Sequence, residues 1–227
     1  IGDRLERVTF RLVGSGGARD MDGELPWRLD PEQSGGGLIM DVGCHLLDRI
    51  DYICGPLEDV RGRAINKKTN LPPQTSGLVE DYVEMKATIG NRKNDDDDAL
   101  IPMQGASVEC TWDFAPQGDD ATPPCDELHF VGNKGSLVMA AMSADGPIRV
   151  LDSEGKLVHE LTFDTPQHTA QQMIQAVTND LRGTKQGTRV LSRGDNALRT
   201  QRVLDTILAS YYGGREVGFW ERMKQEK

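Results

Sequence analysis

The sequence predicts an α+β fold in which a large, mostly antiparallel sheet has helices packed on one face. Short segments of alternating apolar and polar residues recur through the middle of the chain, separated by turn-forming residues, and this is typical of antiparallel strands. Segments with helical spacing of apolar residues lie before and after this region. Because the strands are followed by helices rather than alternating with them, we expect one sheet with its helices on a single face.

The first predicted element is a strand over residues 6–13, where Val8, Phe10 and Leu12 alternate with other residues. This strand is able to form a sheet edge. A loop and a helix follow over residues 31–54, and Gly55-Pro56 end that helix. After this helix the apolar residues repeat with a period of two. Further strands are expected around residues 60–65, 82–89, 106–112, 128–130, 137–139, 148–150 and 157–163.

Two helices are predicted to close this region, over residues 168–182 and 195–212, and glycine follows each of them. Their apolar residues recur at three- and four-residue intervals, which indicates one buried face on each helix. Hairpin turns are clearest at residues 133–135 and 153–155. If all helices cover one face of the sheet, the other face needs a partner subunit or another domain to cover it.

Composition and charge disfavour several classes of function. The 227 residues suffice for one large domain, and a net charge of −10 disfavours nucleic acids and anionic membranes as partners. The sequence contains no apolar run of about 18 residues, so we expect no membrane span. The four cysteines form neither a Cys-x-x-Cys motif nor a zinc-finger spacing. We therefore expect reduced thiols and a cytoplasmic location.

The most informative segment is residues 34–51, where three glycines lead into the first long helix. Asp41, His45 and Asp48 lie at positions i, i+4 and i+7, within about 60° of one another around an α-helix. An imidazole beside a carboxylate can handle protons, because histidine titrates near neutrality. The alternative is an ordinary solvated helix face. The glycines favour a site, since they let a backbone approach a ligand or another strand closely.

A metal site at these three residues is a weaker alternative, which would indicate a metal-dependent hydrolase. Side chains at i and i+4 can chelate a metal ion, but the segment holds one histidine and the sequence places no third strong ligand. Outside the segment, Arg28 is a candidate for binding an anionic or hydroxylated substrate, or for pairing with Asp30 or Glu32. His168 either caps the helix that follows it or lines a substrate pocket.

These residues resemble a known family. Gly35-Gly36-Gly37 followed by Asp41-x-Gly43-x-His45-x-x-Asp48 resembles the motif that opens the second domain of the glucose–fructose oxidoreductase, inositol dehydrogenase and MocA family. The resemblance covers nearly the whole chain, because four other segments agree in the same order: Trp27-Arg28, Glu80-Asp81, the Gly132–Ser136 turn and the C-terminal segment Asp195–Val217.

The resemblance implies an NAD(P)-dependent oxidoreductase acting on a sugar, a polyol or a related small molecule. Family members join an N-terminal Rossmann domain to a C-terminal α+β domain, whose sheet commonly forms an oligomer interface. Their catalytic set implies catalytic roles for Asp41 and His45 here, together with a lysine from the Rossmann domain. It also implies that His168 lines the substrate pocket. With Arg28, we therefore expect Gly36, Gly37 and His168 to contribute to substrate binding.

The sequence departs from the family because it contains no strand–Gly-x-Gly-x-x-Gly–helix unit. Residues 14–17 are the nearest match, and we interpret them as a loop. We therefore predict that residues 1–227 form a single C-terminal substrate domain, with NAD or NADP bound by a missing Rossmann domain. Alone, the chain is expected to be inactive. The alternative is a non-catalytic binding or oligomerisation module that lost its nucleotide domain. The expected partners are a small-molecule substrate, the missing domain and a second copy through the sheet face.

Overall fold

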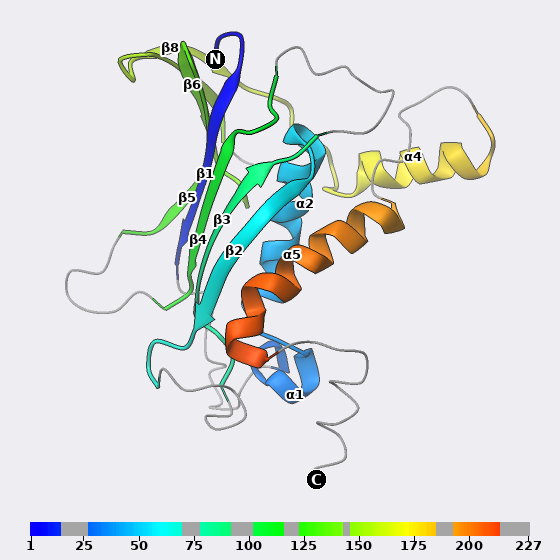
Figure 1. The fold of residues 1–227 in the computed structure, drawn as a ribbon. Coiled ribbons are helices and arrows are strands. Elements are labelled where there is room, and N and C mark those ends of the chain that lie inside the picture. Colours follow the sequence, from blue (N-terminus) through cyan, green and yellow to red (C-terminus); the bar gives the residue numbers. More distant parts are fainter. Residues whose placement is uncertain are drawn as a thin grey trace.

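A computed structural model describes residues 1–14, 27–69, 78–91, 102–115, 123–142, 146–184 and 193–213. Eight strands form one sheet in the order β2-β3-β4-β1-β5-β6-β7-β8. Helices α2 and α5 lie side by side on one face of it, towards the β2 edge (Figure 1). The strands are β1 (Leu5–Val13), β2 (Leu57–Ile65), β3 (Tyr82–Ile89), β4 (Ser107–Asp113), β5 (Cys125–Gly132), β6 (Gly135–Met139), β7 (Ile148–Asp152) and β8 (Leu157–Leu161). The helices are α1 (Pro31–Ser34), α2 (Cys44–Cys54), α4 (Gln171–Leu181) and α5 (Gly194–Tyr212).

The sheet confirms the predicted fold class. Strand β1 lies at its centre, where it pairs in parallel with β4 and antiparallel with β5. All other neighbouring strands pair antiparallel. We expected residues 6–13 to be able to form an edge strand, but β1 is a central strand. Alternation determines which side chains share a face, and it does not determine which strands become neighbours. The edges are instead β2 and β8.

The core lies between the sheet and the pair α2 and α5. Helix α5 approaches β2 closely at Gly62, where an added Cβ would lie 2.8 Å from Ile207 Cγ2. Burial of apolar surface in this layer stabilises the two helices that carry the candidate site. The fully buried core side chains include Trp112, Ile39, Leu46, Leu47, Ile50, Met85, Leu128, Leu204, Ile207 and Leu208.

Helix α4 forms where the apolar spacing predicts a helix, but its apolar face is not buried. Met173, Ile174, Val177 and Leu181 are 38–83% exposed, and none of the described residues of α4 is buried. The prediction of a helix at this position is confirmed. The prediction that this face is buried is wrong for the part of the chain that the structure describes.

Both predicted hairpin turns are present. Gly132 pairs with Gly135 where β5 turns into β6. Asp152 Oδ1 accepts the amide protons of Glu154 and Lys156 in the turn between β7 and β8. All four cysteines are free. No described helix is both long and apolar enough to cross a membrane. Residues 15–17 of the predicted glycine loop and residues 214–217 of the family-like C-terminal segment lie outside the described residues.

Candidate functional site

The glycine run is explained in large part by the protein itself. Gly35 ends helix α1 with a φ of 77°, a left-handed conformation that favours glycine. Gly37 lies against the carboxylate of Glu80, so that an added Cβ would lie 2.6 Å from Glu80 Oε2. Gly36 and Gly37 are both buried. The close approach that three glycines predict is thus made at Gly37 by a carboxylate of the same chain.

Glu80 is only 1% exposed and connects three segments. The Tyr212 hydroxyl, at the end of α5, donates a hydrogen bond to Glu80 Oε2. The Ile39 amide donates to Glu80 Oε1 at 3.4 Å. Burial, and then the neighbouring carboxylate, raise the pKa of Tyr212, which keeps the hydroxyl protonated as a donor. Glu80 therefore fixes the start of the segment that carries Asp41.

Replacing Gly37 with alanine is expected to destabilise the fold by about 1–3 kcal/mol, because the new methyl group would overlap a buried, hydrogen-bonded carboxylate. Chemical denaturation measures this loss. Gly14→Ala is the matched control, since an added Cβ there meets no atom within 4 Å. Combining Gly37→Ala with Glu80→Ala should cost less than the sum of the single changes, because the second removes the obstructing group. Equal stability of Gly37→Ala and the wild type would contradict this explanation.

The segment after the glycines begins as a π-helical turn, Ile39–Gly43, before α2 continues as an α-helix. Asp41 lies within this turn, four residues before His45. Asp41 Oδ2 accepts from Arg28 Nε at 2.9 Å, and both side chains are about half exposed. Arg28 therefore pairs with Asp41, a partner that the sequence did not suggest.

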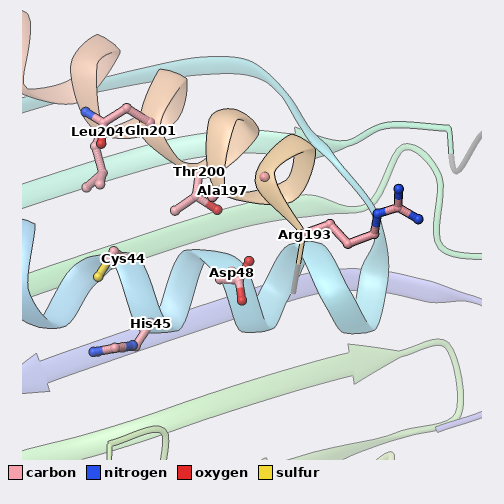
Figure 2. A pocket seen from close by; sticks show the side chains of 9 residues that line it. Cys44, His45, Asp48, Arg193, Ala197, Thr200, Gln201 and Leu204 are labelled. Atoms are coloured by element: carbon pink, nitrogen blue, oxygen red, sulfur yellow. The ribbon is translucent and has the colours of Figure 1, made fainter. Parts of the chain in front are cut away.

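His45 and Asp48 border a cavity of about 510 Å³ between α2 and α5. Figure 2 shows Cys44 on the side of α2 that faces α5, whereas the His45 ring projects from the opposite edge of α2. His45 is exposed, which suits exchange of a proton with a bound molecule. Asp41 does not line this cavity. The other lining residues are Arg193, Gly194, Ala197, Thr200, Gln201 and Leu204.

Two groups in the cavity wall have an unusual environment. Burial raises the pKa of the Cys44 thiol, so this cysteine is not an activated thiolate. Thr200 is only 7% exposed. Its hydroxyl has no hydrogen-bond partner among the described residues. The cavity thus combines a protonated thiol, an unpaired hydroxyl and the Asp48 carboxylate.

Asp48 makes the stability of the fold depend on pH. Burial first, and the nearby Asp51 second, raise the pKa of Asp48 above its ordinary value of 3.8, while Arg199 and His45 act in the opposite direction. An acid whose pKa is raised by folding costs stability when it ionises, so the wild type loses this stability as the pH rises above 3.8.

Asp48→Asn is therefore expected to raise the melting temperature near pH 7, and to lose that advantage at about pH 3.5, where Asp48 itself is protonated. Thermal unfolding at both pH values measures the difference. Asp164→Asn, at an exposed position, is the control and should show no such pattern. An Asp48→Asn protein that melts below the wild type near pH 7 would contradict this account.

The two walls of the cavity are joined by a part-buried ion pair. Arg199 of α5 donates to Asp51 of α2 through Nε at 2.8 Å and Nη2 at 2.6 Å. Asp51 is 6% exposed, so the guanidinium replaces the water that this carboxylate loses on folding. Glu80, Asp51 and Arg199 were not predicted as site residues from the sequence. Asp51 directly follows the core residue Ile50 on α2. The sequence alone does not show that Asp51 is buried, because its partner Arg199 lies far along the chain on α5.

His168 lies apart from these groups in the sequence, just before α4. Its Nδ1 accepts the Ala170 amide proton at 3.1 Å, but Ala170 is itself the N-cap of α4, and the N-terminus of α4 has no side-chain cap. His168 is exposed and does not line the cavity between α2 and α5. Within the described residues, no group of three or more His, Cys, Asp or Glu side chains is arranged to hold a metal ion.

The comparisons with known proteins agree on one family. A family model described as the GFO/IDH/MocA C-terminal domain matches residues 6–138, which is more than half of the chain. Oxidoreductase P35 from Formosa agariphila is 22% identical over 152 residues, which cover 67% of this chain and 38% of that protein.

Solved structures show the same fold at low sequence identity. The aldose-aldose oxidoreductase from Caulobacter crescentus, complexed with glycerol, matches with a TM-score of 0.63 and 19% identity over 93% of this chain and 54% of its own. The WlbA dehydrogenase from Bordetella pertussis, in complex with NADH and UDP-GlcNAcA, matches with a TM-score of 0.56 and 18% identity. The match covers 93% of this chain and 53% of that protein. The chain thus spans about half the length of these two proteins.

Proposed function

Because the chain belongs to the GFO/IDH/MocA family of oxidoreductases, whose C-terminal domain it matches, we propose that it forms the substrate-binding and catalytic half of an NAD(P)-dependent oxidoreductase. The substrate would be a sugar, a polyol or a related small molecule. The observation that carries the proposal is the exposed imidazole of His45, which projects from the edge of α2 away from α5, on the same segment as the Asp41–Arg28 pair. A nicotinamide bound by a domain outside this chain would supply the hydride acceptor.

His45 is the general acid and base of the proposed reaction. In oxidation it accepts the hydroxyl proton of the substrate as the hydride leaves the same carbon, and in reduction it returns that proton. This role requires an imidazole within hydrogen-bond reach of the substrate hydroxyl, and the exposure of His45 allows that approach. Asp41 would accept a hydrogen bond from a second hydroxyl while remaining held by Arg28 at 2.9 Å.

The remaining candidate residues have supporting roles in this proposal. Gly36 and Gly37 shape the loop that leads to Asp41, and Arg28 offers guanidinium donors to substrate oxygens. His168 uses Nδ1 to accept the Ala170 amide proton, which leaves Nε2 to donate to a substrate hydroxyl. Its contribution requires the segment before α4 to reach the bound substrate.

A second copy of the chain is the proposed partner of the open sheet face. Side chains on this face form ion pairs across neighbouring strands, Arg63 with Glu84 at 2.7 Å and Lys86 with Glu109 at 2.9 Å. Such a face is polar but balanced in charge, which suits an isologous contact between two identical surfaces. A non-catalytic binding module remains the alternative function, and the assay below separates the two.

The test is turnover by the natural polypeptide that contains this chain. It should be incubated with NAD⁺ or NADP⁺ and a panel of aldoses, polyols and cyclitols, and reduction of the nicotinamide should be followed by absorbance. We expect reduction with at least one member of the panel. Binding of panel members without any reduction of either nicotinamide would instead support the binding module.

A further inference from the structure

Helix α4 has an apolar face that the described part of the chain does not cover. Met173, Ile174, Val177 and Leu181 are all exposed. They lie on one face of the helix, since positions three, four and seven residues apart are neighbours around it. In Figure 1, α4 lies on the helix side of the sheet and extends away from it. This face is therefore available to pack against another surface.

The length of α4 indicates that it needs such a surface. The helix has 11 residues, and no side chain of the described structure caps its N-terminus. Isolated helices shorter than about 12–15 residues are marginally stable in water, and most helical stability in proteins comes from packing of an amphipathic face. A helix of this kind is thus expected to be packed for much of the time.

A groove of matching length lies between α2 and α5, where the cavity of about 510 Å³ opens. Its α5 wall is one helical stripe from Ala197 to Leu204, which is about 10 Å long. The apolar face of α4, from Met173 to Leu181, is about 12 Å long. Cys44 of α2 points towards α5 (Figure 2), and like Ala197 it is small enough to let another helix approach closely.

The wall of this groove also contains a buried polar group that lacks a partner. Thr200 is 7% exposed, and its hydroxyl makes no hydrogen bond within the described residues. Buried polar groups are nearly always paired, so an unpaired hydroxyl in the wall of an open cavity requires an explanation. A further element of the protein that covers this wall provides one.

The connectivity of the chain allows α4 to be that element. Residues 182–193 join α4 to α5, and a segment of this length spans up to about 40 Å. Helix α5 begins at Gly194, which itself lines the cavity. Helices joined by a short connection commonly pack as antiparallel neighbours. An antiparallel α4 would run beside α5 along the stripe that lines the groove.

We propose that α4 is a lid, whose apolar face packs into the groove between α2 and α5 and covers the cavity. Closure would bury the apolar side chains of α4 and exclude water from the wall that contains Thr200. The His45 ring projects from the opposite edge of α2, so a lid on the α5 side leaves it exposed. The proposal does not depend on the oxidoreductase function, because it concerns only how three helices of this chain pack.

Disulfide trapping tests the closed arrangement, since Cys44 supplies a free thiol in the groove. Met173→Cys and Ile174→Cys are made separately in the natural polypeptide, which is then oxidised mildly, and links to Cys44 are quantified by mass spectrometry of peptides. Gln172→Cys is the matched control, because it adds a thiol to the same turn on the opposite face. We expect at least one of the two variants to form the link about tenfold faster than the control or more.

Blocking the groove should prevent this link. Ala197 is exposed, so Ala197→Trp fills the groove without disturbing the core. Added to the faster-linking variant, it should slow formation of the link about tenfold. Linking of both variants no faster than the control, or a link to Cys44 only between two chains, would overturn the proposal.

Hydrogen exchange tests the lid without introduced cysteines. In the unmodified natural polypeptide, the backbone amides of α4 should exchange much more slowly than those of an unpacked helix, because the closed lid stabilises their hydrogen bonds. Ala197→Trp should speed their exchange about tenfold and leave the amides of the central strand β1 unchanged. Exchange of the α4 amides at the rate of an unstructured segment in the unmodified protein would contradict the lid.

Discussion

Replacing His45 with alanine in the natural polypeptide is expected to lower turnover by about 10²- to 10⁴-fold, the usual contribution of a positioned general acid or base. Affinity for the nicotinamide should change little, because the cofactor is proposed to bind outside this chain. The measurement is steady-state kinetics with saturating cofactor and the substrate identified by the panel. Added imidazole should restore part of the activity if the lost group is a proton carrier.

The control for this experiment is His159→Ala. His159 is an exposed histidine on the edge strand β8, remote in the sheet order from the strands beneath α2 and α5. It should leave turnover unchanged, which excludes a general effect of removing a surface imidazole. Near-normal turnover of His45→Ala would contradict the assignment of His45.

Replacing Arg199 with methionine is expected to cost about 3 kcal/mol of unfolding free energy, because it leaves the Asp51 carboxylate buried without its partner. The figure lies at the low end for buried pairs, since Arg199 is 39% exposed and water can reach part of the site. Urea denaturation followed by circular dichroism measures the loss. Loss of this ion pair should also affect the candidate site, because the pair joins α2, which carries His45, to α5.

Arg4→Met is the matched control. Arg4 also forms a short ion pair, 2.7 Å to Glu6, but its side chain is 64% exposed and that of Glu6 42%. Exposed pairs contribute about 1 kcal/mol or less, so this variant should remain close to the wild type. Adding Asp51→Asn to Arg199→Met should recover part of the lost stability by removing the buried charge. Equal losses for Arg4→Met and Arg199→Met would contradict the importance of burial.

Local patterns were sufficient to predict most of the fold. The period-two segments gave the positions of the strands, and the glycine-ended helical segments gave α4 and α5 to within a few residues. The patterns could not predict the order of the strands, as the central place of β1 shows, because pairing depends on contacts between distant residues. They also could not predict the exposure of α4, since an amphipathic spacing indicates a face able to be buried, not a partner that buries it.

The candidate site was predicted in part. Periodicity placed Asp41, His45 and Asp48 on one line of an α-helix, but Asp41 lies in the π-helical turn Ile39–Gly43 and does not border the cavity. No local signal in the sequence announces that turn. The glycines indicated a close approach, and only the three-dimensional structure identifies Glu80 as the group that approaches Gly37. Spacing rules cannot predict this contact, because Glu80 lies more than forty residues from Gly37 along the chain.

The central claim is that this chain holds the substrate while its proton leaves to His45 and its hydride leaves to a nicotinamide. The most direct measurement uses the natural polypeptide with a substrate deuterated at the carbon to be oxidised, and mass spectrometry of the nicotinamide product. The account predicts that deuterium appears in the reduced nicotinamide, and that His45→Ala slows this transfer strongly. Substrate binding without any transfer of deuterium to either nicotinamide would contradict the claim and identify the chain as part of a binding protein.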